Sequence, residues 1–427
     1  MSRPDWNSLQ KIRVPESREP RDGHGRGDHH APRGGLGWLF RIVAPVIGLF
    51  ARHGRLEVAY RDQAMLRLGD GSGPLYRIRV DSLRLIPRLV RNPDLGCGES
   101  YMDGEWSVEE GDLAGLLGLL LRNYNEAANQ PLGRLICRSG ILARSRANDP
   151  ASSRRNAAHH YDIGNDLYSA FLDEGMNYSC AFFERPGQSL RDAQLNKLRT
   201  STRRLDIPKG AHILDIGCGW GEMTRVIAGE TGAARVVGIT LADNQLKLAR
   251  ERAEELGGDR PEYLLADYRA HADNNPGAYD RIVSIGMFEH VGRKHFVEYF
   301  TAVQRLLRDN GFALIHSIMR PERGETSAWI KKYIFPGGYI PTVDDATAAA
   351  REAGLELAQE PFIHESFHYA ETLRRWRHNF NKAWPRLDHG HYDERFRRMW
   401  NFYLCGSEAA FDANGLFVGQ ILLKKRS

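Results

Sequence analysis

The residues best suited to chemistry begin where an apolar strand breaks into three closely spaced glycines. The stretch from Ile213 to Glu222 reads ILDIGCGWGE and places Gly217, Gly219 and Gly221 just before a helix-compatible run. Glycines at such a turn bring backbone N–H groups near a helix N-terminus, where ligand oxygens are held favourably. The pattern predicts a nucleotide-like cofactor, although a strand-to-helix turn without a ligand shows the same spacing.

The position of the nearest acidic residue separates two classes of cofactor. A dinucleotide fold places an acid at the end of its second strand, where it holds the ribose hydroxyls. Here the second predicted strand ends in Thr240 and Leu241, and Asp215 lies in the first strand instead. This arrangement resembles the first motif of S-adenosylmethionine-dependent methyltransferases, in which the glycine loop takes the methionine part of the cofactor. We therefore expect S-adenosylmethionine rather than NAD.

The elements that position these residues alternate between short apolar strands and amphipathic helices. Such alternation predicts a doubly wound α/β domain with a mostly parallel sheet, in which ligands bind outside the C-terminal ends of the strands. The predicted elements beyond the glycine loop are Arg235–Thr240, Asp243–Leu256, Tyr263–Asp267, Tyr279–Ile285, Lys294–Arg308 and Phe312–Ile318. The positions expected to face the site, each closing or following a strand, are Gly217, Thr240, Asp267, Glu289 and His316.

Composition divides the chain into four parts. Residues 1–34 carry almost no periodic apolar residues and are predicted to be a disordered tail. Residues 35–125 are predicted to form a smaller α+β domain, followed by a basic linker over 126–155 and the catalytic domain over 156–427. The smaller domain is predicted to contain strands Leu56–Tyr60 and Leu75–Val80, helices Ser82–Arg91 and Asp112–Asn123, and a glycine-rich loop from Gly96 to Trp106.

Targeting and redox signals favour a cytoplasmic protein. The apolar run from Leu36 to Ala51 is interrupted by Arg41 and Pro45 and is shorter than the roughly 20 residues that span a membrane. It starts too far from Met1 for a signal peptide, and it suits either a membrane interface or a buried helix. The odd count of five cysteines, without a C-x-x-C pair, argues against a disulfide scaffold and favours a reducing compartment.

From Arg134 to Arg155 the linker carries six arginines and a single acid, Asp149. Such a patch suits anionic lipid or nucleic acid, although a solvated linker without a partner is an equally simple interpretation. The six are Arg134, Arg138, Arg144, Arg146, Arg154 and Arg155.

Eight motifs together resemble the cyclopropane-fatty-acyl-phospholipid synthases and the related mycolic acid cyclopropane synthases. The resemblance covers residues 156–427 and, more loosely, the first domain. The motifs are HHYDIGNDLYSAFLD from His159, NYSCAFFE from Asn177, LDIGCGWGE from Leu214, GITLADNQ from Gly238, SIGMFEHVG from Ser284, IHSI from Ile315, YIFPGGYIP from Tyr333 and HYAETLRRW from His368.

This resemblance implies two sets of site residues and a Rossmann-like class I methyltransferase domain. With the glycine loop, the residues implied for S-adenosylmethionine are Tyr178, Ser179, Asp215, Gly217, Gly219, Gly221, Thr240, Leu241, Gln245, Asp267 and Tyr268. Those implied for a bicarbonate ion are Cys180, Glu289, His316, Ile318 and Tyr369.

The resemblance also implies the reaction and its partners. A methylene passes from S-adenosylmethionine to the cis double bond of a phospholipid acyl chain through a carbocation, and bicarbonate removes the proton that closes the cyclopropane. The implied partner is the phospholipid surface on the inner face of the cell membrane, with no role for nucleic acid. The N-terminal domain over residues 35–125 is expected to associate with this lipid surface, and a homodimer is a family-level expectation.

Several readings of individual residues remain open from the sequence. Cys180 could be a thiolate nucleophile or a small buried hydrophobe, and His290 and His295 lack the further ligands that a metal site needs. Aromatic side chains near the motifs can stabilise a cation, although each is by default a core residue. The aromatic residues concerned are Tyr178, Phe182, Phe183, Phe288 and Tyr339.

Three rival functions share most of these features. A relative that methylates the same alkene but loses a different proton gives a methylene- or methyl-branched chain. A catalytically silent lipid-binding protein would keep the fold, and a small-amine methyltransferase would need no lipid. The intact Cys180, Glu289, His316 and Tyr369 argue against the silent protein.

Overall fold

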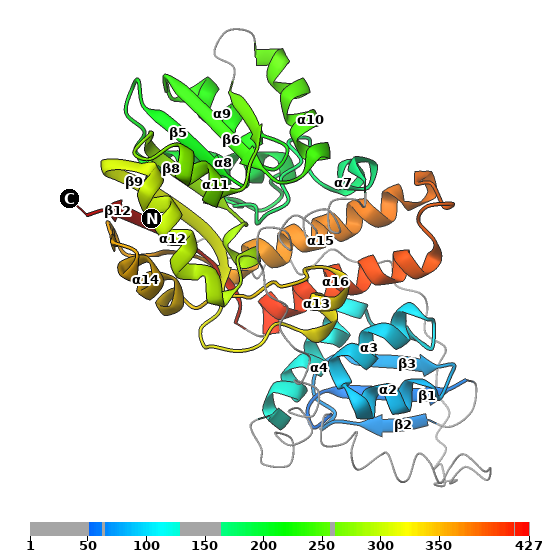
Figure 1. Cartoon of the computed structure of the whole chain (residues 1–427). Helices are drawn as coiled ribbons and strands as arrows, with labels where there is room; N and C mark the ends of the chain where they lie inside the picture. The colour runs from blue at the N-terminus through cyan, green and yellow to red at the C-terminus, as the bar shows by residue number, and fades with distance from the viewer. Residues whose placement is uncertain (1–50, 62–64, 129–163, 257–260, 414, 427) are drawn as a thin grey trace.

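The computed structural model describes residues 51–61, 65–128, 164–256, 261–413 and 415–426 (Figure 1). The predicted tail 1–34, most of the apolar run and nearly all of the basic linker, including its six arginines, lie outside the described residues. Within the described ranges, none of the helices combines the length and apolarity that crossing a bilayer requires.

An eight-stranded sheet forms the centre of the larger part, in the order β10-β12-β9-β8-β5-β6-β7 with β11 paired to β12. The middle strands run parallel, and β12 is antiparallel to β9. The strands are β5 (His212–Ile216), β6 (Arg235–Thr240), β7 (Glu262–Leu265), β8 (Tyr279–Ile285), β9 (Leu307–Met319), β10 (Leu355–Leu357), β11 (Phe362–His364) and β12 (Phe417–Lys425).

Helices cover both faces of this sheet because its strands are apolar on both sides. One face packs against α8 (Leu190–Leu205) and α9 (Glu222–Glu230), with α10 (Asp243–Ala253) beside β6 and β7. The other face packs against α11 (Tyr268–Asn274), α12 (Phe296–Leu306) and α14 (Val343–Glu352). The predicted doubly wound α/β class is confirmed.

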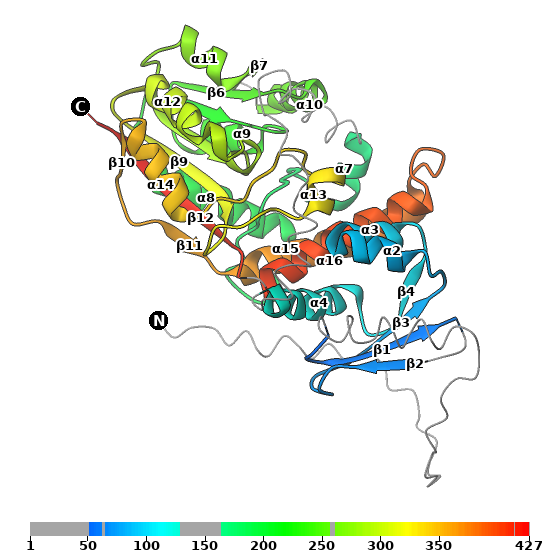
Figure 2. The same ribbon diagram turned by 60° about the horizontal axis from the view of Figure 1, so that its bottom comes forward.

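A second, four-stranded sheet forms the smaller part in the order β2-β1-β3-β4. Figure 2 shows this sheet at the end of the molecule farthest from the large sheet, with helices between the two. Its strands and helices are β1 (Arg55–Tyr60), β2 (Met65–Leu68), β3 (Leu75–Val80), α2 (Leu85–Arg91), α3 (Pro93–Met102), β4 (Trp106–Glu110) and α4 (Leu113–Ala128).

The two parts share one hydrophobic core. Helices α3 and α4 pack against the long helix α16 (Glu394–Ala413), and α3 also contacts α13 (Ala328–Tyr333). Polar contacts reinforce this packing, since Asp94 accepts a hydrogen bond from Ser327 Oγ at 2.9 Å and Glu99 pairs with Lys332 at 2.5 Å. The remaining helices of the larger part are α7 (Asn165–Phe171) and α15 (Ser366–Ala383), which lies antiparallel to α16.

The predicted loop from Gly96 to Trp106 is wrong, because most of it belongs to helix α3. The Asn92 side chain caps this helix by accepting from Leu95 N–H at 3.1 Å, and Pro93 occupies its first turn. The glycines serve close packing instead. A Cβ atom on Gly98 would lie 2.3 Å from the Trp329 ring, and one on Gly96 would lie 2.5 Å from the Arg88 carbonyl.

Candidate active site

A cavity of about 210 Å³ is lined by residues that follow β5, β6, β7 and β8. It therefore lies at the carboxyl edge of the parallel strands, where α/β sheets bind ligands. The lining contains all but one of the residues predicted to hold the cofactor: Tyr178, Ser179, Asp215, Gly217, Gly219, Thr240, Leu241, Gln245, Asp267 and Tyr268.

The glycine loop shapes this cavity more than it supplies donors. The N–H groups of Gly217 and Cys218 both donate to the Ile239 carbonyl, at 2.9 and 3.0 Å, and so tie the loop to β6. An added Cβ on Gly219 would meet no atom within 4 Å, so this residue borders open space. The expectation that the loop offers bare N–H groups to a ligand is therefore wrong at Gly217 and Cys218.

Gly221 is the predicted cofactor residue that does not line the cavity. It precedes α9 with a φ of 86°, and an added Cβ would lie 2.5 Å from Tyr263 Oη. Its carbonyl accepts hydrogen bonds from the Tyr263 and Thr224 hydroxyls. Gly221 thus serves the packing of the helix start against β7.

Buried charges of opposite sign face the cavity from α8 and β5. Lys197 is only 1% exposed, and its Nζ donates to Ser179 Oγ at 2.8 Å. Burial lowers the pKa of Lys197 to about 8 and raises the pKa of Asp215 to about 7. The Asp215 Oδ2 atom has no hydrogen-bond partner among the described residues. Sequence reasoning missed Lys197.

Polar side chains from the next two loops complete the cavity. The Thr240 hydroxyl donates to Gln245 Oε1 at 2.9 Å, which fixes the amide at the start of α10. Asp267 caps α11 by accepting from Arg269 N–H at 2.9 Å, and it also pairs with the Arg269 guanidinium at 2.8 Å. Tyr268 is buried beside it.

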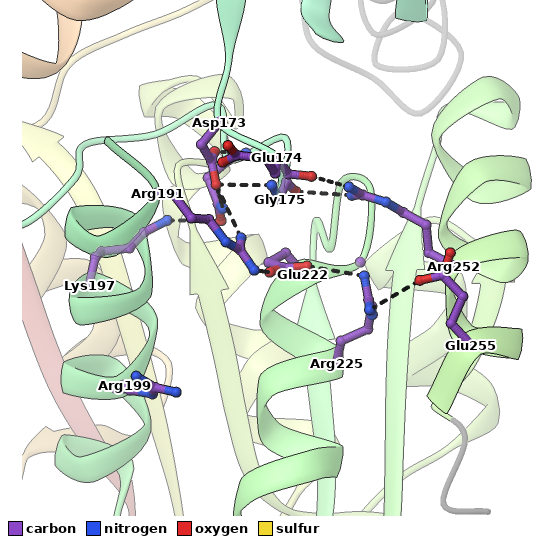
Figure 3. Close-up of polar contacts among 12 residues, drawn as sticks. Asp173, Glu174, Gly175, Arg191, Lys197, Arg199, Glu222, Arg225, Arg252 and Glu255 are labelled. Carbon is purple, nitrogen blue, oxygen red and sulfur yellow. Dashed lines mark hydrogen bonds and ion pairs between the residues drawn. The ribbon is translucent and has the colours of Figure 1, made fainter. Parts of the chain in front are cut away.

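Arginines from α8 and α10 hold the segment that leads into the cavity lining at Gly175 (Figure 3). Arg191 bridges Asp173 at 3.2 Å and Glu222 at 2.6 Å, and Arg252 donates to the Gly175 carbonyl at 3.1 Å. Glu222 itself lines the cavity, so the charge network reaches its wall. The segment from Asp173 onward is therefore held against three helices of the large domain.

Glu289, on the 3₁₀ turn η3 (Phe288–His290), is a buried carboxylate with one unused oxygen. Its Oε1 accepts from Ile318 N–H at 2.6 Å, which brings two of the predicted bicarbonate residues into direct contact. Its Oε2 has no partner among the described residues. Burial raises the pKa of Glu289 to about 7.

His316 lies on β9 two residues before Ile318 and is 2% exposed. Its Nδ1 contacts Gln420 Nε2 at 3.2 Å, whereas its Nε2 has no partner in the described part of the chain. Burial holds the pKa of His316 well below its usual value, so the imidazole is neutral. Sequence reasoning missed Gln420.

Cys180 and Tyr369 complete the predicted set. Burial raises the pKa of the Cys180 thiol, which donates to the Ala181 carbonyl at 3.2 Å, so the thiolate interpretation is not supported. Burial also raises the pKa of Tyr369, and the nearby Tyr403, Cys180 and Glu289 add to this shift. Tyr369, on α15, is therefore within electrostatic range of both Cys180 and Glu289.

Of the five aromatic residues singled out in the sequence, Tyr178 lines the cavity. Phe288 is fully buried and stacks on Phe296 with ring centroids 4.3 Å apart, and Tyr339 packs on the same ring. Other lining residues were not predicted individually, namely Trp220, Met287, His290 and Phe335. All four lie within motifs quoted above, which is the signal that pointed to them.

The sheet order, the antiparallel β12 beside β9 and the cavity after the glycine turn define a class I methyltransferase fold of the Rossmann-like type. The family described as mycolic acid cyclopropane synthetase matches residues 148–421. The chain belongs to this family.

Individual relatives extend the similarity beyond that match. The chain is 37% identical over 411 residues to tuberculostearic acid methyltransferase UfaA1 of Mycobacterium tuberculosis, covering 91% of this chain and 92% of that protein. It is 35% identical over 370 residues to cyclopropane-fatty-acyl-phospholipid synthase of Escherichia coli, covering 83% and 89%. The structure of mycolic acid cyclopropane synthase CmaA1 complexed with SAH and CTAB has a TM-score of 0.57 and 30% identity, covering 64% of this chain and 98% of that one.

Proposed function

We propose that the chain is a cyclopropane-fatty-acyl-phospholipid synthase that uses S-adenosylmethionine as methyl donor and bicarbonate as general base. The observation that carries this proposal is the pair of unused buried atoms, Glu289 Oε2 and His316 Nε2, within the set of residues that the family resemblance assigns to bicarbonate. Buried polar atoms without partners are rare in native structures and point to a missing partner.

The cavity suits S-adenosylmethionine in its polarity and position. Lys197 and Ser179 offer donors to a carboxylate, and Asp215 offers an acceptor to an ammonium. Gln245 and Asp267 also line the cavity, and we expect them to bind the ribose hydroxyls. When bound, this cofactor would supply an electrophilic methyl group on a sulfonium. The relative whose structure is complexed with SAH supports this choice of cofactor.

The second set of residues suits a small hydrogen-bonding anion. A bicarbonate ion carries one O–H and acceptor oxygens, so it can donate to Glu289 and accept from His316 and Tyr369. Glu289 would then orient the ion and would not itself remove the substrate proton. The protonated Cys180 thiol leaves no competing nucleophile beside the developing carbocation.

A second candidate is a methyltransferase that gives a methylene- or methyl-branched acyl chain. The identity to tuberculostearic acid methyltransferase, at 37% over 91% of this chain, favours it. The two reactions start from the same alkene and cofactor and share the first carbocation. Proton loss from the new methyl carbon with bond formation to the cationic carbon closes the ring, whereas a 1,2-hydride shift before that proton loss gives the methylene branch. A methyl-branched product would further require reduction of the methylene group by an external hydride donor.

Mass spectrometry of lipid products tests both candidates. The purified protein is incubated with S-adenosylmethionine carrying a CD₃ group and vesicles of cis-unsaturated phospholipid. We expect chains heavier by CD₂, with a ring shown by fragmentation, and a dependence on added bicarbonate. A methylene-branched product would establish the second candidate, and the absence of any lipid product would contradict both.

Access to acyl chains requires contact with a bilayer, so we also propose peripheral association with the inner face of the cell membrane. The basic linker, which lies outside the described residues, is the proposed contact. Vesicle binding that changes with neither salt nor anionic lipid would contradict this proposal.

A further inference from the structure

A chain of buried hydrogen bonds runs from α8 to His316 through β12. The Ser201 hydroxyl donates to the Lys197 carbonyl at 2.9 Å, and Gln420 Nε2 lies 3.0 Å from Ser201 Oγ and 3.2 Å from His316 Nδ1. Ser201 and Gln420 are both fully buried. These two residues belong to neither of the predicted site sets.

The directions of these bonds follow from the number of protons available. A serine hydroxyl has one proton, and a helical serine gives it to the carbonyl four residues earlier. Ser201 Oγ must therefore accept from Gln420, so the amide presents its NH₂ group to both Ser201 and His316. His316 Nδ1 is then an acceptor.

A neutral imidazole carries its single proton on one nitrogen, so an accepting Nδ1 places the proton on Nε2. His316 is held neutral by burial, and the neighbouring His364 of β11 and Lys197 of α8 act in the same direction. The Nε2 atom is the one without a partner among the described residues. A proton there makes His316 a donor.

We propose that Gln420, oriented by Ser201, is a positioning residue that fixes His316 in the Nε2–H tautomer so that it donates a hydrogen bond to the anion at the candidate site. The inference rests on the proposed function for the identity of that anion. The tautomer itself is a property of this chain and can be measured without turnover.

Nitrogen NMR of the protein labelled with ¹⁵N-histidine tests the tautomer directly. The His316 signals are assigned by their loss in His316→Asn. In the wild-type protein we expect a protonated Nε2 and an unprotonated Nδ1. A proton on Nδ1 in this spectrum would overturn the proposal, whether or not any variant folds.

Gln420→Glu reverses the bond that sets the tautomer, because an ionised carboxylate accepts from Nδ1–H. Above about pH 8 we expect His316 to carry its proton on Nδ1 and the KM for bicarbonate to rise by about tenfold or more, with little change in the KM for S-adenosylmethionine. Gln188→Glu is the matched control, since this buried glutamine uses its oxygen to accept from Glu184 N–H.

The outcomes separate this inference from the proposed function. An unchanged tautomer and an unchanged bicarbonate KM in Gln420→Glu would overturn the role of Gln420 even if cyclopropane is formed. A wild-type enzyme that needs no bicarbonate would contradict the proposed base, while the wild-type spectrum would still decide the tautomer. A loss of kcat alone, shared with Gln188→Glu, would indicate a structural role and also overturn the proposal.

Discussion

At the scale of single residues, two buried carboxyl groups share a raised pKa of about 7 but face different parts of the site. Asp215 borders the cavity proposed for the cofactor, beside Lys197, whereas Glu289 accepts a hydrogen bond from Ile318 N–H within the set predicted for bicarbonate. Burial is the main cause in both, because a charged carboxylate loses its hydration. Both groups are therefore partly protonated near neutral pH, and their ionisation should be visible in kinetics.

We expect kcat to rise with pH through about 7, because Glu289 can accept the bicarbonate O–H only when ionised. Glu289→Gln should abolish this rise of kcat with pH and lower kcat by about tenfold to a hundredfold while leaving cofactor affinity nearly intact. The measurement is a pH profile with the bicarbonate concentration held fixed. Asp215→Asn is the control. It should change the KM for S-adenosylmethionine and leave the rise of kcat with pH in place. Wild-type kcat in Glu289→Gln would exclude this role.

Gln245→Ala should weaken S-adenosylmethionine binding by about tenfold, because the amide held by Thr240 is buried in the cavity wall. Isothermal titration calorimetry of the cofactor measures the change. Gln304→Ala on α12, outside the cavity lining, is the control and should leave the Kd unchanged. An unchanged Kd in Gln245→Ala would remove this residue from the cofactor site.

The residues that could be predicted from the sequence are those within recognisable motifs, and Lys197 and Gln420 show why others could not. Lys197 lies on the buried face of α8 together with Ala193, Leu198 and Ser201. A charge within an apolar helical stripe was a signal, but periodicity alone does not show what the charge faces. Gln420 contacts His316 across 104 residues, and no local pattern encodes that pairing.

At the scale of elements, helices and strands were predicted correctly where a single hydrophobic periodicity dominated the sequence. The prediction failed where glycines were compatible with either a turn or close packing within a helix. The strands Arg235–Thr240 and Tyr279–Ile285 are confirmed with the predicted first and last residues, because buried strands appear in the sequence as short apolar runs. Helix α3 was missed because its glycines suggested a turn. The packing role of these glycines depends on a contact that is distant in sequence. Gly98 lies against Trp329, which belongs to a helix more than two hundred residues later in the chain.

Gly98→Ala should lower the free energy of unfolding by about 1–3 kcal/mol, because the new Cβ would lie 2.3 Å from the Trp329 ring. Chemical denaturation followed by tryptophan fluorescence measures the loss. Gly118→Ala on α4 is the matched control, since its Cβ would meet atoms no closer than 3.8 Å, and it should stabilise the protein by roughly 0.5–1 kcal/mol. Equal effects of the two changes would contradict the packing interpretation.

At the scale of the whole molecule, the smaller sheet does not stand apart from the catalytic domain. Its helices share a core with α13, α15 and α16, and ion pairs such as Asp103 with Arg395 cross the same boundary. A separation of the chain by composition alone could not reveal this, because the shared core joins residues from both ends of the sequence.

Calorimetric unfolding should therefore show one cooperative transition for the two parts together. Removing the smaller sheet and its helices would expose apolar side chains of α16, including Phe402, that are buried in the shared core. Differential scanning calorimetry of the full chain gives the result. Two well-resolved transitions, one of them retained in a variant lacking residues 1–128, would show that the parts are independent.

The position of β12 has a consequence for synthesis on the ribosome. Strand β9 is complete long before β12 appears, so one edge of a 13-residue strand stays unpaired while about a hundred more residues are translated. Exposed edges of this kind invite pairing with other chains. The strand that closes the edge also carries the glutamine that contacts His316, so a nascent chain gains its protected sheet and its complete candidate site in the same event.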